Sequence, residues 1–408
     1  MNLLVFQTAY TYDEMEKRNL SIFFTSKDLG GYFKKVITVH PIANYGKMLE
    51  SHSLFAKPRL ITHNDRHLFI EGSIARFKIL RKVAPLNFLI AQFELFFVIR
   101  RVTKSIKIDF VRAEDPRFNG IWGFIFSRIL DVPLLVGNWG NPETIRALTG
   151  KPMMPRFYRS IRAEVFVERF ILRHSDLALA QNPDNMQFVL NSGVDVGKTA
   201  MFKLGNAIQL CHFESPNQRV KSRLKALNSV NPKTKILLCA FMIERRKILE
   251  DAIDVVEILI REFDVKLFVA GEGTARTHYE KYVLDKGMQK DIIFLGNISQ
   301  VELSSLMVRA DVILSPLTGR ALAEAVLSET PVVAYDIDCH PELIKNGETG
   351  ELVPFRNRRE MAAKTAFILN HPEYGAQLGK AGRNFALKYM DPQSINMEQI
   401  HIYESLLT

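Results

Sequence analysis

The stretch from Ala310 to Pro354 constrains the fold most, because it alternates short apolar runs with loops and helix-like segments. Residues 312–314 are an apolar run of the length of a buried strand, and residues 331–334 are another. Between them, residues 315–319 form a loop with Pro and Gly, and residues 320–328 fit a helix. This order predicts parallel strands joined by helices, as in an open α/β sheet.

The loop at residues 315–319 leads directly into the N-terminus of the helix that follows it. In an open α/β sheet, such a loop is where a phosphate binds, because the first amides of the helix point toward the ligand. Glu324 lies in the second turn of this helix and can accept hydrogen bonds from sugar hydroxyls. The stretch therefore predicts a site for a nucleotide or a sugar nucleotide.

The same alternation of strands and helices continues through both halves of the chain, whose 408 residues favour two domains. We expect an α/β protein with two Rossmann-like, doubly wound domains that face a central cleft at the carboxyl ends of their sheets. The predicted domains are residues 1–210, residues 211–390, and a C-terminal helix at 391–408 that packs back on the first domain. The expected strands are residues 3–6, 36–39, 110–112, 133–136, 177–180, 200–203, 235–239, 266–269, 292–295, 312–314 and 331–334.

The excess of positive charge is confined to the N-terminal half of the chain. Residues 1–210 contain 29 Lys and Arg against 18 Asp and Glu, a net charge of +11, and the remaining residues have a net charge of −1. A basic half beside a neutral half predicts an anionic partner such as a membrane surface or an acidic saccharide. Nucleic acid is not expected, because the basic residues are not interleaved with aromatic ones as in known modules.

The three cysteines are scattered, which suits a reducing cytoplasm and argues against a disulfide framework. No CxxC pair is present, and the Cys339-His340 pair has no partner ligands, so we expect no metal. The chain opens on an apolar run without a signal peptide, and we expect a cytoplasmic protein, peripheral at the inner membrane face.

Residues 84–99 are rich in Phe and Leu and are flanked by Arg and Lys. The stretch is too short and too polar to span a bilayer, which needs about 20 apolar residues. Two interpretations remain open: a buried helix of the first domain with a basic rim, or an interfacial helix on anionic lipid.

The second half resembles the retaining GT-B glycosyltransferases of glycosyltransferase family 4. The resemblance runs from about Lys235 to Val353 and rests on segments in a fixed order. These segments are ILLCAF, ERRKILEDAI, KLFVAGEG, IIFLGNISQVELSSLMVRADVILSP and LAEAVLSETPVVAYDIDCHPELIKNGETGELV. The first half matches more weakly, through DFVRAEDPRFNGIWGFIFSRILDVPLLV and FVERFILRHSDLALAQNPDNMQFVLNSGV.

The resemblance implies roles for residues in the second half. Glu324 corresponds to the carboxylate that holds the nucleotide ribose, and Lys247 to the lysine that neutralises the departing diphosphate. The family's further arginine is missing. Arg245, Arg246 or Arg320 could supply its charge, and Arg246 is our catalytic candidate. The other expected donor-binding residues are Thr318, Gly319, Arg320, Ala321 and Leu322 at the helix start, and Gly271 and Gly273 in the AGEG segment.

The chain departs from the family at two places. Pro316 stands eight residues before Glu324, where the family has a glutamate that contacts the donor sugar. On the acceptor side, the family's histidine is replaced near Asn138 and Trp139. We take these two residues and Arg112 as acceptor-binding candidates. Asp115, which follows a predicted strand, is the candidate catalytic carboxylate.

These features predict a retaining hexosyltransferase. It would transfer a sugar from a nucleotide-diphospho-sugar to a saccharide or lipid-linked acceptor in cell-surface polysaccharide or glycoconjugate synthesis. The donor is a substrate, and no separate cofactor is expected. Two alternatives stay open: a non-catalytic GT-B subunit that binds a partner or a glycan, and a GT-B nucleotide-sugar epimerase.

Overall fold

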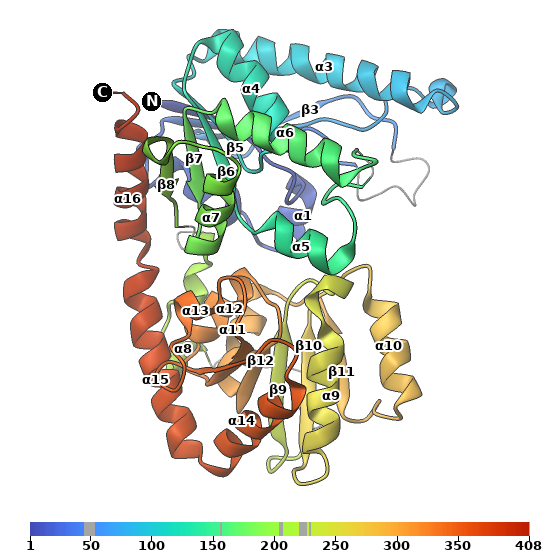
Figure 1. The fold of residues 1–408 in the computed structure, drawn as a ribbon, viewed down its shortest axis with the longest axis vertical. Coiled ribbons are helices and arrows are strands. Elements are labelled where there is room, and N and C mark those ends of the chain that lie inside the picture. The colour runs from blue at the N-terminus through green and yellow to red at the C-terminus, as the bar shows by residue number, and fades with distance from the viewer. Residues whose placement is uncertain (45–53, 156, 204–206, 220–226, 228–229, 408) are drawn as a thin grey trace. The chain divides into compact units, whose positions relative to one another are not determined.

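The computed structural model describes residues 1–44, 54–155, 157–203, 207–219, 227 and 230–407. The chain divides into two compact units (Figure 1). The N-terminal unit comprises Met1–Ala207 together with Gln393–Thr408, and the C-terminal unit comprises Ile208–Pro392. Each unit is built around a mostly parallel sheet, which is the predicted α/β class.

In the described part of the N-terminal unit, eight strands form one sheet in the order β3-β4-β2-β1-β5-β6-β7-β8. All pairs are parallel except β3 and β4, which form an antiparallel edge. The six strands predicted for this half are confirmed, and the β3–β4 hairpin is an addition. The strands are β1 Asn2–Phe6, β2 Lys35–His40, β3 Arg59–Thr62, β4 His67–Glu71, β5 Phe110–Ala113, β6 Leu134–Asn138, β7 Leu177–Ala180 and β8 Thr199–Met201.

Side chains of the central strands alternate between two buried clusters, because successive residues of a strand point to opposite faces. Leu4 and Phe6 of β1 lie in the cluster that α3, α4, α6 and α7 cover, whereas Leu3 and Val5 lie in the cluster on the other face. The helices are α1 Tyr12–Lys17, α2 Ile22–Thr25, α3 Ala84–Ser105, α4 Phe118–Leu130, α5 Pro142–Thr149, α6 Ile161–Arg173 and α7 Pro183–Asn191, with 3-10 turns η1 Ser26–Asp28, η3 Lys78–Leu80 and η4 Val196–Lys198.

The last helix of the chain, α16 (Pro392–Glu404), completes the second face of this sheet. Tyr403 is fully buried there, with its ring edge-on to Phe33 at 4.9 Å and to Phe110 at 5.1 Å between ring centroids. Its hydroxyl accepts a 3.0 Å hydrogen bond from Arg112 of β5. The end of the chain is thus part of the core of the N-terminal unit.

Within the part of the C-terminal unit that the structure describes, six strands form a parallel sheet in the order β11-β10-β9-β12-β13-β14. The five strands predicted for this half from position 235 to position 334 are confirmed. The strands are β9 Lys235–Ala240, β10 Val265–Ala270, β11 Ile292–Gly296, β12 Val312–Ser315, β13 Val332–Tyr335 and β14 Glu351–Val353. One buried cluster of this unit is formed by apolar residues of these strands with those of α9, α10 and α14.

Local sequence explains where these helices begin. Ser299 caps α11 through a reciprocal pair of hydrogen bonds with Glu302, the capping box that favours a helix start. Asn357 caps α14 by accepting from the amide of Glu360. The helices of the C-terminal unit are α8 Pro216–Arg219, α9 Leu249–Leu259, α10 Arg276–Asp285, α11 Gln300–Arg309, α12 Arg320–Val326, α13 His340–Leu343, α14 Arg358–Asn370 and α15 Pro372–Tyr389, with 3-10 turns η6 Leu210–His212 and η8 Arg245–Lys247.

The longest helix, α3, contains the Phe-rich stretch at residues 84–99 and continues to Ser105. Among the described residues, no helix is both long enough and apolar enough to cross a membrane. One side of α3 is buried in the sheet cluster through Ala91, Leu95 and Ile99. The structure therefore contains the buried helix of the first interpretation.

Candidate donor and acceptor sites

The loop that follows β12 meets the 3-10 turn η8 at one edge of the C-terminal sheet. The ammonium group of Lys247 donates a 2.9 Å hydrogen bond to the carbonyl oxygen of Thr318. Among the described residues, the one atom within 4 Å of a Cβ added to Gly319 would be Lys247 Nζ, at 3.8 Å. Because β9 and β12 are neighbours, the segments after their carboxyl ends converge there. The structure thus brings together three of the predicted donor-site residues.

His340, for which the sequence predicted no role, fixes this loop. Its Nδ1 lies 2.8 Å from the carbonyl oxygen of Tyr335, which can only accept, so Nδ1 carries the proton. Nε2 is then the acceptor for the amide of Thr318, at 3.3 Å. Burial lowers the pKa of His340 to about 4, which keeps the ring neutral and able to accept. A neutral histidine after β13 therefore orients the loop after β12.

Glu324 lies one turn inside α12, and its side chain is only 5% exposed. Its carboxylate lies 3.6 Å from the guanidinium of Arg320, four residues earlier on the same helix. Among the described residues, the structure gives this carboxylate no hydrogen-bond donor. A buried carboxylate normally has donors, so Glu324 has acceptor capacity left for a ligand such as a diol.

Two loops of the C-terminal unit pack so closely at Gly271 and Gly273 that these positions have no room for a side chain. A Cβ atom at Gly271 would lie 2.0 Å from the carbonyl oxygen of Phe241, and one at Gly273 would lie 2.1 Å from that of Ile243. Gly271 also has φ +140°, a conformation that side chains rarely adopt. These glycines let the loop after β10 pack on the segment after β9, which leads into η8 and Lys247.

The remaining donor candidates occupy different environments. Leu322 is fully buried in the domain core, so its side chain serves packing. Ala321 is partly buried at the start of α12. The backbone of Arg246 lies in η8, but its side chain is outside the part that the structure describes. Pro316, which stands in place of a glutamate, is buried in the loop itself.

Two of the acceptor candidates, Arg112 on β5 and Trp139 directly after the neighbouring strand β6, share one carboxylate. Arg112 is buried and donates to Glu114 at 2.9 Å, and the indole nitrogen of Trp139 donates to the same carboxylate at 2.7 Å. Burial alone would raise the pKa of Glu114, but the charges of Arg112 and Lys27 and the bond from Trp139 lower it overall. Glu114 was not predicted from the sequence, and it organises this edge of the sheet.

Lys27 completes this cluster from η1. Its ammonium group lies 3.4 Å from the Glu114 carboxylate, and its side chain is buried. Burial lowers the pKa of Lys27 to about 8, although the charge of Glu114 opposes the shift. The cluster therefore balances two cations against one carboxylate in the interior of the N-terminal unit.

Asp115 and Asn138 follow β5 and end β6, respectively. The carboxylate of Asp115 accepts from the amide of Arg117 at 2.8 Å and from the side chain of Asn119, so it is already engaged at the start of α4. The side-chain nitrogen of Asn138 is buried and, within the described residues, has no hydrogen-bond acceptor. Asn138 is thus an acceptor candidate with unused hydrogen-bonding capacity, as is Arg112, whose Nε also has no partner among the described residues.

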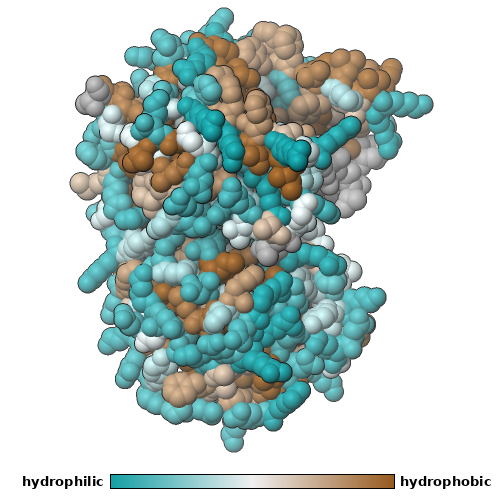
Figure 2. Space-filling view, in the orientation of Figure 1, coloured by the Kyte–Doolittle hydropathy of each residue, from teal (hydrophilic) through white to brown (hydrophobic). Residues whose placement is uncertain are grey.

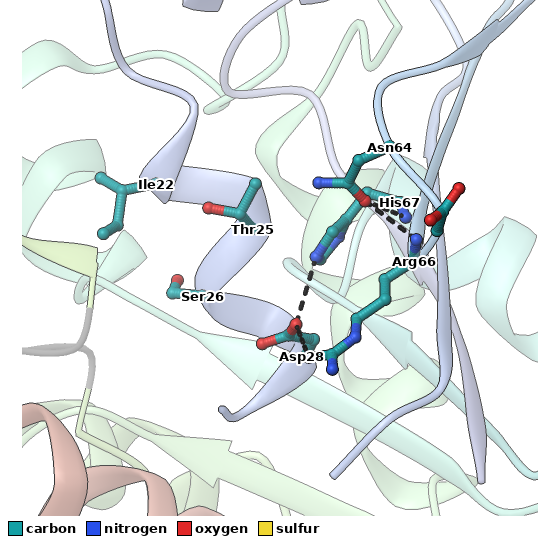
Figure 3. Close-up of a pocket in the computed structure, with 8 residues that line it drawn as sticks. Ile22, Thr25, Ser26, Asp28, Asn64, Arg66 and His67 are labelled. Carbon is teal, nitrogen blue, oxygen red and sulfur yellow. Dashed lines mark hydrogen bonds and ion pairs between the residues drawn. The ribbon is translucent and has the colours of Figure 1, made fainter. Parts of the chain in front are cut away.

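A separate pocket lies at the opposite edge of the N-terminal sheet, where β2 and β4 begin (Figure 3). Asp28 points toward His67 and Arg66, with its carboxylate 3.5 Å from His67 Nε2 and 3.3 Å from Arg66 Nη1. None of the predicted site residues lines it. The candidate sites described above lie at carboxyl ends of strands, so this pocket is distinct from them.

Comparison with known proteins finds a family similarity in the C-terminal unit. Residues 220–385 match the family model described as "Glycosyl transferases group 1". This segment is similar to the group 1 glycosyl transferases. The match spans the loop after β12, Lys247 and Glu324, so the residues that the structure brings together lie inside the glycosyl transferase segment.

Two relatives are similar over part of the chain. One is a poly(ribitol-phosphate) alpha-N-acetylglucosaminyltransferase of Staphylococcus aureus (strain COL), 26% identical over 38% of this chain and 32% of that protein. The other is a phosphatidyl-myo-inositol mannosyltransferase of Mycobacterium leprae (strain TN), 28% identical over 36% of this chain and 39% of that protein. The matches span about a third of the length of these curated relatives.

Solved structures match over the whole chain. The Anabaena protein Alr3699/HepE, solved in complex with UDP and glucose, has a TM-score of 0.72 and 16% identity over 99% of this chain and 100% of that one. At this identity the likeness concerns the fold. The predicted fold, two Rossmann-like domains of the GT-B glycosyltransferases, is therefore confirmed.

Proposed function

We propose that the protein transfers a sugar from a nucleotide-diphospho-sugar to a saccharide or lipid-linked acceptor, with retention, as in glycosyltransferase family 4. The observation that carries the proposal is the contact of Lys247 with the carbonyl oxygen of Thr318, at the loop that opens the glutamate-bearing helix α12. A cation, a helix start and a carboxylate one turn further on suit the diphosphate and the ribose of a sugar nucleotide.

Each group has a distinct chemical task in this proposal. The bond between the sugar and the diphosphate breaks as positive charge develops on the sugar, and the leaving diphosphate gains negative charge. Lys247, Arg320 and the first amides of α12 would stabilise that charge, which is the largest contribution in many enzymes. Glu324 would accept hydrogen bonds from the ribose. No step in this scheme requires a metal ion.

The names of the relatives support a phosphate-bearing or lipid-linked acceptor. One relative acts on poly(ribitol-phosphate) and another on phosphatidyl-myo-inositol, as their names state. The N-terminal half of this chain has a net charge of +11, which attracts an anionic acceptor. Asn138 and Trp139 at the end of β6 are the proposed acceptor contacts, and synthesis of cell-surface glycans is the proposed setting.

Pro316 favours a second candidate, a non-catalytic GT-B subunit. The family uses a glutamate at this position to contact the donor sugar, whereas Pro316 is buried and has no polar side chain. The loss of this contact alters or removes sugar recognition. The ribose and diphosphate residues are retained, so both candidates predict that a nucleotide binds.

A thermal-shift screen of nucleotides and nucleotide sugars, followed by a transfer assay with each stabilising compound, tests the proposal. A ligand that binds only the folded state raises the melting temperature with its concentration. We expect UDP, GDP or ADP derivatives to stabilise the wild-type protein and one donor to be consumed only when acceptor is added. Stabilisation without turnover would support the non-catalytic subunit, and interconversion of free donor would support an epimerase. No stabilisation by any nucleotide would overturn the proposed donor site.

A further inference from the structure

The outer side of α3 has a row of exposed apolar side chains on a helix whose other side is fully packed. Leu86, Leu89, Phe93 and Phe97 are 47%, 63%, 65% and 55% exposed. They recur every three or four residues, so they lie along one stripe of the helix. A space-filling view shows an apolar surface over α3 (Figure 2). The side chains that hold α3 on the sheet are different ones, so packing within this unit does not explain the stripe.

Cationic side chains lie before and after this apolar stripe. From Lys78 to Lys107 the chain contains a single carboxylate, Glu94, which is engaged with Arg76 at 2.6 Å. Arg100 and Lys104 follow Phe97 at helical spacing and extend the stripe at its C-terminal end. The cations of this segment are Lys78, Arg81, Lys82, Arg100, Arg101, Lys104 and Lys107.

A groove beside the C-terminal end of α3 combines the two properties. Apolar side chains of Leu60 on the edge strand β3 and of Phe97 and Val102 on α3 form part of its lining. Arg100, Arg101 and Lys104 line the same groove. The apolar side chains of this groove can contact the acyl chains of a lipid, and the three cations beside them can contact its phosphate.

We propose that the outer side of α3, with this groove, docks on the surface of a bilayer that contains anionic lipid. From Leu86 to Phe97 the stripe is about 16 Å long, at 1.5 Å per residue, which fits a helix lying in the interface. The phenylalanines and leucines enter the acyl boundary, and the cations at both ends meet lipid phosphates. A second copy of this chain is a poorer occupant, because face-to-face contact would oppose like charges.

This inference stands independently of sugar transfer, because vesicle binding needs neither a donor nor an acceptor. It also reconciles the two interpretations of residues 84–99. Ala91, Leu95 and Ile99 make the helix part of the core, while Leu89, Phe93 and Phe97 remain exposed for the membrane. One helix serves both purposes on opposite sides.

Co-sedimentation of the full chain with vesicles tests the proposal. We expect binding to vesicles of phosphatidylcholine with about one third phosphatidylglycerol, and at least about tenfold weaker binding to pure phosphatidylcholine. Phe93→Glu and the double variant R100E/R101E should each weaken binding to the anionic vesicles by about tenfold or more. Added salt should weaken the wild-type interaction, because it screens the cations.

The matched control is the double variant V196E/K198E. Val196 is 72% exposed and Lys198 is also exposed, both on η4 of the same unit, so this variant changes the same kinds of residue away from α3. We expect it to bind like the wild type, and thermal melting should show that all variants remain folded. Undiminished binding of folded Phe93→Glu and R100E/R101E would overturn the proposal. So would equal binding to neutral vesicles, or dimerisation that Phe93→Glu abolishes without any vesicle binding.

Discussion

Lys247 and Thr318 are joined by a 2.9 Å hydrogen bond from Nζ to the carbonyl oxygen, although 71 residues separate them in sequence. The bond places an ammonium group at the loop that precedes α12.

Lys247→Ala should lower the rate of sugar transfer by about a hundredfold, because one charge-stabilising donor is lost. Lys247→Arg should retain more activity. Transfer rates at saturating donor provide the measurement, with the exposed Lys281→Ala as control. An unchanged rate in Lys247→Ala would remove this residue from the proposed site.

Glu324 should control nucleotide binding more than folding. Its carboxylate is the acceptor proposed for the ribose, so Glu324→Ala should abolish the thermal shift given by the stabilising nucleotide. Glu324→Gln keeps one oxygen acceptor and should retain part of the shift. Both proteins should melt cooperatively without ligand. A full shift in folded Glu324→Ala would place the ribose elsewhere.

His340 predicts a pH dependence of stability. Its pKa falls to about 4 in the folded protein because it is buried, against about 6.5 when unfolded. Between these values the unfolded chain binds more protons, so stability rises with pH across this window and is lost as pH falls from 6.5 toward 4. The free energy of unfolding, measured with urea, should be lower at pH 5 than at pH 7. We expect this decrease to be about 2 kcal/mol smaller in His340→Gln than in the wild type. His40, whose pKa is also lowered to about 4 by burial, is kept in both proteins and cancels in the comparison. An identical pH dependence in both proteins would contradict the assignment.

Two glycines near the donor loop should respond differently to alanine. In Gly273→Ala the new methyl group meets the carbonyl oxygen of Ile243 at 2.1 Å, which should cost about 1–3 kcal/mol of stability. In Gly319→Ala the methyl group makes an ordinary contact with Lys247 Nζ, at 3.8 Å, so the change in stability should stay within about 0.5 kcal/mol. Gly319→Ala should instead weaken nucleotide binding, because the methyl group occupies ligand space. Urea unfolding and nucleotide titration separate the two effects, and a stable Gly273→Ala would contradict the contact.

The strands of both sheets were predictable because they are apolar runs buried on both faces, as in Leu3–Phe6 and Val312–Leu314. The β3–β4 hairpin was not predicted. Its outer strand, Arg59–Thr62, is largely exposed and carries no run of buried apolar residues. Edge strands of this kind lack the run of buried apolar residues by which a central strand is identified in a sequence.

The placement of candidate site residues was predictable where it depends on the order of elements within one segment. Glu324 and Thr318 follow from the strand, loop and helix order. His340 and Glu114 were missed because their roles come from contacts across strands, with Thr318 in one unit and with Arg112 and Trp139 in the other. Such partners are set by the register of neighbouring strands, which a single sequence does not display.

The burial of Tyr403 among Phe33 and Phe110 has a consequence for biosynthesis. The N-terminal unit is discontinuous in sequence, since residues 208–392 are inserted before its last helix. A ribosome makes the sheet of this unit first and the helix that covers it last. Until α16 emerges, one face of the nascent sheet lacks part of its cover, so completion of the first domain waits for synthesis of the second.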